Sequence, residues 1–367
     1  MSDKNSNHSD LSELRQQIDS LDQQIQQLIS DRARLALAVG DRKGPQAQPV
    51  DYYRPEREAQ VLRSVIERNQ GPLSDTEMVR LFREIMASCL AQQEPLRVAY
   101  LGPEGTFTQQ AVLQHFGHAV RAVAQSSVES IFTQVQSCEA DFGVVPVENS
   151  TQGMVSHTLD MFLNSELKIC AEVELRIHQN LLTRAPGLEP IERVYSHPQS
   201  LAQCRLWLRD HLPDAELIPV SSNAEAARRV RHAPDAAAIA GRTAAEVYGL
   251  PVLFSEIEDQ PDNSTRFLVI GRDLFPPSGD DKSTLLLAGK AGPGALHQLL
   301  TPLARADINM TRIESRPSRL GKWDYVFFVD VEGHAAESPL RETLDELRQV
   351  ARMVTVLGAY PKALNPT

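Results

Sequence analysis

The chain has 367 residues, of which 42% are hydrophobic and 23% are charged, a composition ordinary for a soluble globular protein of two or three domains. A formal net charge of −11 disfavours a nucleic-acid partner, because such binding depends on Lys and Arg contacts to phosphates. No run approaches the ~20 apolar residues of a membrane helix, and the polar N-terminus lacks an export signal, so we expect a cytoplasmic protein without a membrane partner.

The four cysteines lie far apart, and no histidine stands near them at the spacing of metal ligands. This pattern is typical of a reduced compartment and predicts neither a disulfide framework nor a metal site.

Residues 10–94 are predicted to form an all-helical domain after a disordered tail at 1–9. Apolar side chains step by three and four along the first helix, as in a coiled-coil seam: Leu11, Leu14, Ile18, Leu21, Ile25 and Leu28. So short a segment can hardly bury this seam alone, and we expect an intertwined homodimer or a higher homo-oligomer. A second helix is predicted from about Pro55 to Asn69, and a third begins at the capping box of Ser74 and Glu77.

Arg32 stands where the seam demands an apolar residue. A buried guanidinium is costly unless an anion or a carboxylate meets it. By itself, Arg32 is also explained by an interhelical salt bridge or a frayed helix end. Other polar side chains converge on the same helical core, however: Arg15, Lys43, Arg57, Glu58 and Gln93. Together they predict a pocket for a small dianion.

This set resembles the pattern of the all-α chorismate mutases, which have two arginines on a long first helix, then Lys, Arg-Glu and a distal Gln. The resemblance implies that Arg15 and Arg32 bind the two carboxylates of chorismate, one of them from the partner subunit. Lys43 and Gln93 would hydrogen-bond the ether oxygen, and Glu58 would orient the ring hydroxyl.

Two positions depart from the chorismate mutase pattern. Arg54 stands where the family usually has Asp, and Cys89 stands where it has Ser, so the minor substrate contacts of these positions differ. The Claisen rearrangement itself needs a compact substrate conformer and stabilisation of negative charge on the ether oxygen, without a nucleophile or a cofactor.

Residues 96–275 alternate strand-like and helix-like stretches, which predicts an α/β sheet domain. Four polar runs flank its strands: 102–107, 146–151, 196–199 and 263–267. Each run alone is explained by a capped turn. Together they are expected to converge on a crevice outside the strand ends, where open α/β sheets bind ligands.

These runs resemble the prephenate dehydratase family over nearly all of 97–275, including its Thr-Arg-Phe signature and its Ser-His-Pro-Gln turn. The resemblance implies two lobes of the periplasmic-binding-protein type, with prephenate in the cleft between them. Thr265 would be the essential hydroxyl. The other residues implied in substrate binding are Thr106, Asn149, Gln199, Arg266, which would pair with a carboxylate, and Phe267. Glu148 and His197 are alternative proton sources for the leaving hydroxyl.

A linker at 276–282 is predicted to precede a domain at 283–367 with the βαββαβ order of a ferredoxin-like fold. Gly294-Ala295-Leu296 and Glu314-Ser315-Arg316-Pro317 resemble the two motifs of the ACT domain that follows dehydratases. The resemblance implies that L-phenylalanine is an allosteric effector, with its carboxylate at the helix start and its ammonium group near Glu314. A purely structural dimerisation module is the alternative.

The sequence thus predicts a multidomain enzyme with chorismate mutase and prephenate dehydratase activities and no cofactor. Two other classes stay open. A sensor or binding protein without catalysis leaves the dianion pocket unexplained. A dehydratase whose helical segment only dimerises the chain would require ordinary salt-bridge partners for Arg32 and Glu58.

Overall fold

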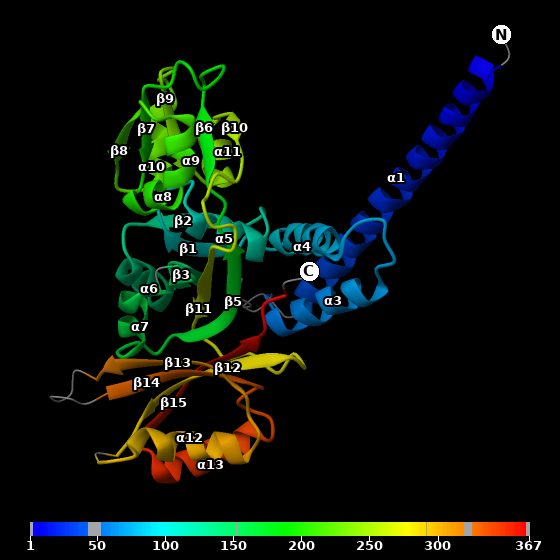
Figure 1. Ribbon diagram of the computed structural model, residues 1–367. Coiled ribbons are helices and arrows are strands. Elements are labelled where there is room, and N and C mark those ends of the chain that lie inside the picture. Colours follow the sequence, from blue (N-terminus) through cyan, green and yellow to red (C-terminus); the bar gives the residue numbers. More distant parts are fainter. Residues whose placement is uncertain (1–2, 43–52, 152, 291, 319–324, 365–367) are drawn as a thin grey trace.

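The computed structural model describes residues 3–42, 53–151, 153–290, 292–318 and 325–364 (Figure 1). Three helices at the N-terminal end adjoin a two-lobed α/β part, and a smaller α+β domain follows at the C-terminal end. Within these ranges we find no helix with the length and apolar character needed to cross a membrane.

The N-terminal part contains α1 (Asp3–Asp41), α3 (Pro55–Arg68) and α4 (Asp75–Ala91). The first of these helices begins inside the segment 1–9 that the sequence predicts as a tail. Ser74 caps α4 as predicted, because its hydroxyl accepts a hydrogen bond of 3.2 Å from the Glu77 N–H. The helices α3 and α4 pack against each other and carry one wall of a cavity described below.

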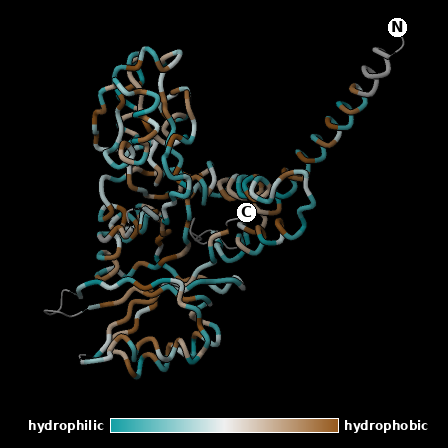
Figure 2. The backbone as a smooth tube through the Cα atoms, in the orientation of Figure 1, coloured by the Kyte–Doolittle hydropathy of each residue, from teal (hydrophilic) through white to brown (hydrophobic). Residues whose placement is uncertain are grey.

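The long helix α1 projects away from the rest of the chain, and hydrophobic residues recur along it (Figures 1 and 2). Its predicted seam is open to solvent in the single chain: Leu21 is 55% exposed and Leu28 is 68% exposed. A line of exposed leucines and isoleucines of this length marks an interaction surface.

The first lobe of the α/β part is a mixed sheet in the order β5-β11-β3-β1-β2, with β4 paired to β3. Its strands are β1 (Arg97–Leu101), β2 (Arg121–Gln125), β3 (Phe142–Asn149), β4 (Gly153–Met154), β5 (Lys168–Arg176) and β11 (Ser264–Gly271). Its helices are α5 (Phe107–Phe116), α6 (Val128–Gln136) and α7 (Ser156–Phe162). Adjacent strand residues enter different cores: Val144 packs with residues of α5, and Val145 packs with residues of α6.

The second lobe is a five-stranded sheet in the order β10-β6-β9-β7-β8. Its strands are β6 (Asn180–Thr183), β7 (Arg193–Ser196), β8 (Glu216–Pro219), β9 (Ala236–Ala240) and β10 (Val252–Phe254). Its helices are α8 (Pro198–Gln203), α9 (Arg205–His211), α10 (Asn223–Val230) and α11 (Arg242–Tyr248). The chain passes between the lobes twice, from β5 to β6 and from β10 to β11, so the two lobes face each other across a cleft.

The sequence predicts one helix from Gln199 to Asp210, and the structure divides it into α8 and α9 at Cys204. The φ of Cys204 is −113°, outside the helical range. Asp259, far along the chain, accepts hydrogen bonds from the N–H groups of Leu206 and Trp207 and so starts a new helix.

The C-terminal domain confirms the predicted βαββαβ order. Its elements are β12 (Asp281–Ala288), α12 (Ala295–Arg305), β13 (Met310–Pro317), β14 (Tyr325–Glu332), α13 (Leu340–Val350) and β15 (Met353–Pro361). The sheet order is β13-β14-β12-β15, and both helices pack on the face turned away from the α/β part (Figure 1).

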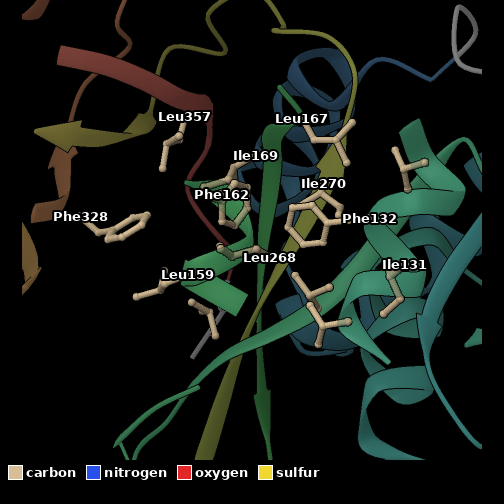
Figure 3. Packing of buried hydrophobic residues seen from close by; sticks show 14 of the residues in the cluster. Ile131, Phe132, Leu159, Phe162, Leu167, Ile169, Leu268, Ile270, Phe328 and Leu357 are labelled. Carbon is tan, nitrogen blue, oxygen red and sulfur yellow. The ribbon is translucent and has the colours of Figure 1, made fainter. Parts of the chain in front are cut away.

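One buried cluster joins the C-terminal domain to the first lobe (Figure 3). Phe328 and Leu357 of the C-terminal sheet pack in it with Ile169 and Leu268 of the lobe. The two sheets also meet directly, because Gly358 of β15 pairs with Ile169 of β5. A Cβ atom on Gly358 would lie 2.2 Å from the carbonyl oxygen of Ile169, so only glycine allows this approach.

We predict that Gly358→Ala lowers the free energy of unfolding by about 1–3 kcal/mol, because the added methyl group forces the two sheets apart. Urea unfolding of the full chain measures the change. Gly187→Ala is the control, since no described residue beyond its two chain neighbours has an atom within 4 Å of the added Cβ there. Equal unfolding midpoints for the two variants would contradict the prediction.

Tyr53, which leads into α3, anchors the helical part on the first lobe. Its ring is buried and packs edge-on against Phe142 at a centroid distance of 5.1 Å. Its hydroxyl lies 2.8 Å from Nε2 of His115 on α5. Burial, with a smaller effect of Arg83, lowers the pKa of His115 to about 3. His115 is therefore neutral in the folded protein at neutral pH.

A histidine with a depressed folded pKa stabilises the fold above its unfolded pKa of about 6.5, and the stability is lost as the pH falls toward 3. We predict that His115 accounts for a loss of about 1–2 kcal/mol between pH 7 and pH 5. Urea unfolding at both pH values should show a smaller loss for His115→Gln than for the unchanged protein. An identical loss in both proteins would refute this.

Candidate active sites

A cavity of about 380 Å³ lies among α1, α3 and α4, and Phe116 of α5 forms part of its wall. Six residues predicted for the mutase site line this cavity: Arg32, Arg54, Arg57, Glu58, Cys89 and Gln93. Arg15 lies on the exposed part of α1 and does not line it. Lys43 lies outside the described residues.

Arg32 is half-buried at this cavity, and no acid among the described residues forms an ion pair with it. The adjacent Asp31 pairs with Arg34 instead. The guanidinium of Arg32 is therefore available to an anionic ligand, and its alternative explanation as half of an intrachain salt bridge has no support in the described part of the chain.

Glu58 pairs with Arg83 of α4, whose Nε lies 3.4 Å from Glu58 Oε1. Burial raises the pKa of Glu58, and the charge and hydrogen bond of Arg83 oppose that rise. The sequence analysis missed Arg83. It follows Val79 by four residues on the packed side of the third helix, so the argument used for Arg32 applies to it as well.

Gln93 closes the cavity against α1. Its Nε2 donates a hydrogen bond of 2.9 Å to the carbonyl of Ala36, and its Oε1 is buried without a partner among the described residues. Gly40 makes room for the amide, because a Cβ there would lie 2.4 Å from Gln93 Nε2. An unpartnered buried amide oxygen is typical of a site that a ligand or a second chain completes.

A second cavity, of about 340 Å³, lies between the two lobes of the α/β part. Five of the residues predicted for the dehydratase site line it: Thr106, Asn149, Gln199, Thr265 and Phe267. They come from α5, β3, α8 and β11 and from the turns beside them. The structure therefore brings the four polar runs of the sequence together at one cleft.

Thr265 and Asn149 lie opposite each other in the pairing of β11 with β3. Asn149 Nδ2 donates to Thr265 Oγ1 at 2.9 Å and to Asn263 Oδ1 at 3.0 Å. The Thr265 hydroxyl thus accepts a hydrogen bond from the protein. Among the described residues no protein acceptor takes its hydrogen, which is available to a ligand in the cleft.

A network of amides and hydroxyls forms the opposite wall. Gln179 Nε2 donates to Ser200 Oγ and to Gln203 Oε1, at 3.2 Å each, and Asn223 Nδ2 donates to Ser200 Oγ at 2.9 Å. Two buried NH₂ groups of the cleft have no partner in the described chain: Gln203 Nε2 and Asn263 Nδ2. The sequence analysis did not select Gln179, because this residue lies in the segment that crosses between the lobes and belongs to no motif.

Arg266 does not reach the cleft. Its guanidinium lies on the other face of the sheet, 2.8 Å from Glu172 and 2.6 Å from Asp330. Successive side chains of a strand point to opposite faces, so Thr265 and Arg266 cannot both enter one site. The carboxylates that Arg266 meets in the folded chain are those of Glu172 and Asp330, outside the cleft.

Of the two alternative proton sources, His197 lines the cleft and Glu148 does not. Nδ1 of His197 accepts a hydrogen bond from the Gln199 N–H, which leaves the proton on Nε2. No Lys or Arg is found among the described residues that line the cleft. Thr106 and Ser222 cap the N-termini of α5 and α10 at the cleft, and such helix ends attract anions.

The two predicted effector motifs lie in α12 and β13. Gly294 caps α12 with a φ of +76°, and Ala295 and Leu296 form its first turn. Glu314, Ser315, Arg316 and Pro317 end β13, which is the edge strand of its sheet. Arg316 pairs with Asp160 of α7 at 2.8 Å. The described residues of these motifs line neither the helical cavity nor the cleft between the lobes.

Comparison with known proteins gives three matches to family models along the chain. Residues 14–94 match chorismate mutase type II, residues 98–274 match prephenate dehydratase, and residues 284–349 match the ACT domain. A bifunctional chorismate mutase/prephenate dehydratase from Stutzerimonas stutzeri is 53% identical over 358 residues, which cover 96% of this chain and 98% of the relative. The chain belongs to the family of bifunctional chorismate mutase/prephenate dehydratases.

Two further relatives support this assignment. The bifunctional enzyme of Pseudomonas aeruginosa is also 53% identical, over 96% of this chain and 98% of its own length. The crystal structure of a prephenate dehydratase from Arthrobacter aurescens in complex with L-Phe is 36% identical, with a TM-score of 0.68, over 74% of this chain and 92% of that one. The predicted fold class and the two predicted enzyme activities are confirmed. The roles of single residues stay predictions.

Proposed function

We propose that this protein converts chorismate to prephenate in the helical cavity and prephenate to phenylpyruvate in the cleft between the lobes. The observation that carries the proposal is the half-buried guanidinium of Arg32, which has no ion-pair partner in the described chain and lies beside Arg57, Glu58 and Gln93 in one cavity. A positive group held this way, in a chain of net charge −11, is accounted for by a dianionic substrate.

In the mutase step, Arg32 binds one carboxylate of chorismate, and Arg15 of a second chain binds the other. Lys43 and Gln93 donate to the ether oxygen as its bond to carbon breaks, after the Gln93 amide turns from Ala36 toward the ligand. Glu58, held by Arg83, accepts a hydrogen bond from the ring hydroxyl. Arg54, Arg57 and Cys89 line the rest of the cavity.

In the dehydratase step, the carbon–carbon bond to the departing carboxylate and the carbon–oxygen bond to the hydroxyl both break, giving CO₂, water and an aromatic ring. Thr265, held by Asn149, donates its hydrogen bond to the leaving hydroxyl. His197 carries the one imidazole among the described residues that line the cleft, and Glu148 does not line it, so we assign the proton to His197.

The substrate carboxylates meet N–H donors in the cleft, since its described lining holds no cation. The unpartnered NH₂ groups of Asn263 and Gln203 and the N-terminal ends of α5 and α10 are suited to this task. Gln199 and Phe267 complete the wall, and the apolar surface of Phe267 favours loss of charge as CO₂ departs.

We also propose that the protein is a cytoplasmic homodimer that L-phenylalanine inhibits. The solvent-exposed seam of α1 and the open edge of β13 are the surfaces that a second chain would cover. Glu314, which has no ion pair among the described residues, suits the ammonium group of the effector, and the start of α12 at Gly294 suits its carboxylate.

The test is conversion of chorismate to phenylpyruvate by the purified protein without added cofactor, with and without phenylalanine. We predict that Arg32→Ala lowers chorismate turnover by at least about 100-fold and leaves prephenate turnover largely intact. Thr265→Ala is predicted to do the reverse. Equal damage to both activities in both variants would refute the two-site assignment.

The dimer has a test of its own. Leu21→Glu places a charge in the seam, and we expect it to yield monomers that have lost mutase activity by at least about tenfold, because Arg15 no longer reaches the partner cavity. Size-exclusion chromatography with light scattering gives the mass. The control is Gln23→Glu, which adds the same charge outside the seam. A monomeric mutase with full activity would contradict the shared site.

A further inference from the structure

The strands β3 and β11 form two adjacent cross-strand pairs of residues, and the side chains of one pair lie on the opposite face of the sheet from those of the other. Asn149 and Thr265 line the cleft, whereas Glu148 and Arg266 contact the C-terminal domain. The strands pair so that Thr265 lies opposite Asn149 and Arg266 lies opposite Glu148. A contact that fixes the side chains of Glu148 and Arg266 therefore also fixes the backbone next to Asn149 and Thr265.

Residues of the C-terminal domain hold both of these side chains. Arg312 of β13 lies with its Nε 3.4 Å from Glu148 Oε2. Asp330 of β14 accepts from Arg266 Nη1 at 2.6 Å, and Tyr360 of β15 accepts from Arg266 Nη2 at 3.1 Å. The contacts come from three strands of one sheet, so they move with the C-terminal domain as a unit.

The ionic groups at this boundary balance. Three cations and three acids take part: Arg266, Arg312, Lys282, Glu148, Glu172 and Asp330. Glu172 binds both Arg266 and Lys282, and its side chain is only 6% exposed; that of Asp330 is 5% exposed. A displaced partner would leave a buried charge uncompensated, so the network allows few alternative positions.

Arg312 has a second link to the cleft. Its Nη2 contacts the sulfur of Met154, and Met154 lines the cleft from β4. In the pairing of β3 with β4, Met154 lies opposite Glu148, and Gly153 lies opposite Asn149. One arginine of the C-terminal domain thus touches the strand that carries Asn149 and one of the two strands paired beside it.

We propose that Arg312 is a positioning residue for the dehydratase reaction, acting through Glu148 on the strand end that carries Asn149, and that Asp330 acts in the same way on Thr265 through Arg266. This inference rests on the proposed dehydratase function. The hydrogen bond from Asn149 orients the Thr265 hydroxyl, so a small shift of either strand turns that hydroxyl away from the leaving group.

The experiment measures both activities of full-length Arg312→Gln. We expect its kcat for prephenate to fall between about 10- and 100-fold, while KM changes less than about threefold and chorismate turnover is unchanged. Arg312→Lys keeps the charge and should recover most of the loss. The matched control is Arg348→Gln, which removes an arginine–aspartate pair of the same domain that lies within α13.

A prephenate kcat of Arg312→Gln equal to that of the unchanged protein overturns the proposal. If Arg312→Gln also loses chorismate turnover, the substitution has damaged the fold. The near-isosteric variant Glu148→Gln then provides the test, and a prephenate kcat equal to that of the unchanged protein in this variant also overturns the proposal. Failure of the unchanged protein to convert prephenate would count against the proposed function, which keeps the two claims separate.

A double-mutant cycle tests the route itself. If Arg312 acts through Glu148, the double variant Arg312→Gln/Glu148→Gln has a prephenate kcat no lower than the worse single variant. A loss equal to the product of the single losses would show that the two residues act independently, and the proposed route would be wrong.

Discussion

In the antiparallel pairing of β3 with β11, Thr265 lies opposite Asn149 and Arg266 lies opposite Glu148. Because side chains alternate along a strand, this register gives the cleft an amide–hydroxyl pair and gives the domain boundary two ionic groups. A slip by one residue would exchange the faces, placing charges in the cleft and the hydroxyl at the boundary. The hydroxyl that we propose as reactive and the ionic groups behind it thus come from one backbone arrangement.

The chain is strongly acidic although its substrates are anions, and the two proposed sites differ in the groups that attract an anion. The helical cavity collects guanidinium groups, among them Arg32 and Arg57. The cleft between the lobes presents amide NH₂ groups and helix N-termini in its described lining. The dehydratase reaction converts a carboxylate into neutral CO₂. Fixed dipoles stabilise that carboxylate less strongly than a full positive charge does, so they oppose its loss less.

The helix α5 connects the two cavities physically. Its N-terminal cap, Thr106, lines the cleft, and Phe116 at its other end lines the helical cavity. The distance along its axis is roughly 15 Å for ten residues. Arg83, which holds Glu58, also donates to the carbonyl of Gln114 near the end of this helix. Arg83 and Phe116, which line the helical cavity, therefore also form part of the contact between the N-terminal helices and the first lobe.

The sequence by itself determined the local elements and the residue types of the sites. The three-four spacing of apolar residues predicts α1, the capping box at Ser74 predicts α4, and polar runs after strands predict the cleft. Each signal lies within a few residues, where hydrogen-bonding and side-chain periodicity act directly. The family motifs added the chemistry that such runs alone leave open.

Only the tertiary structure decided on which side of a sheet or helix each side chain lies and which distant residue it contacts. Arg266 belongs to a dehydratase signature, yet it binds Asp330 in another domain. Asp259 divides a predicted helix at Cys204, and Arg83 joins Glu58 across two helices. Such contacts join residues dozens of positions apart in the sequence, and no local pattern encodes them. They form because a buried charge or N–H group must find a partner wherever the packed chain brings one.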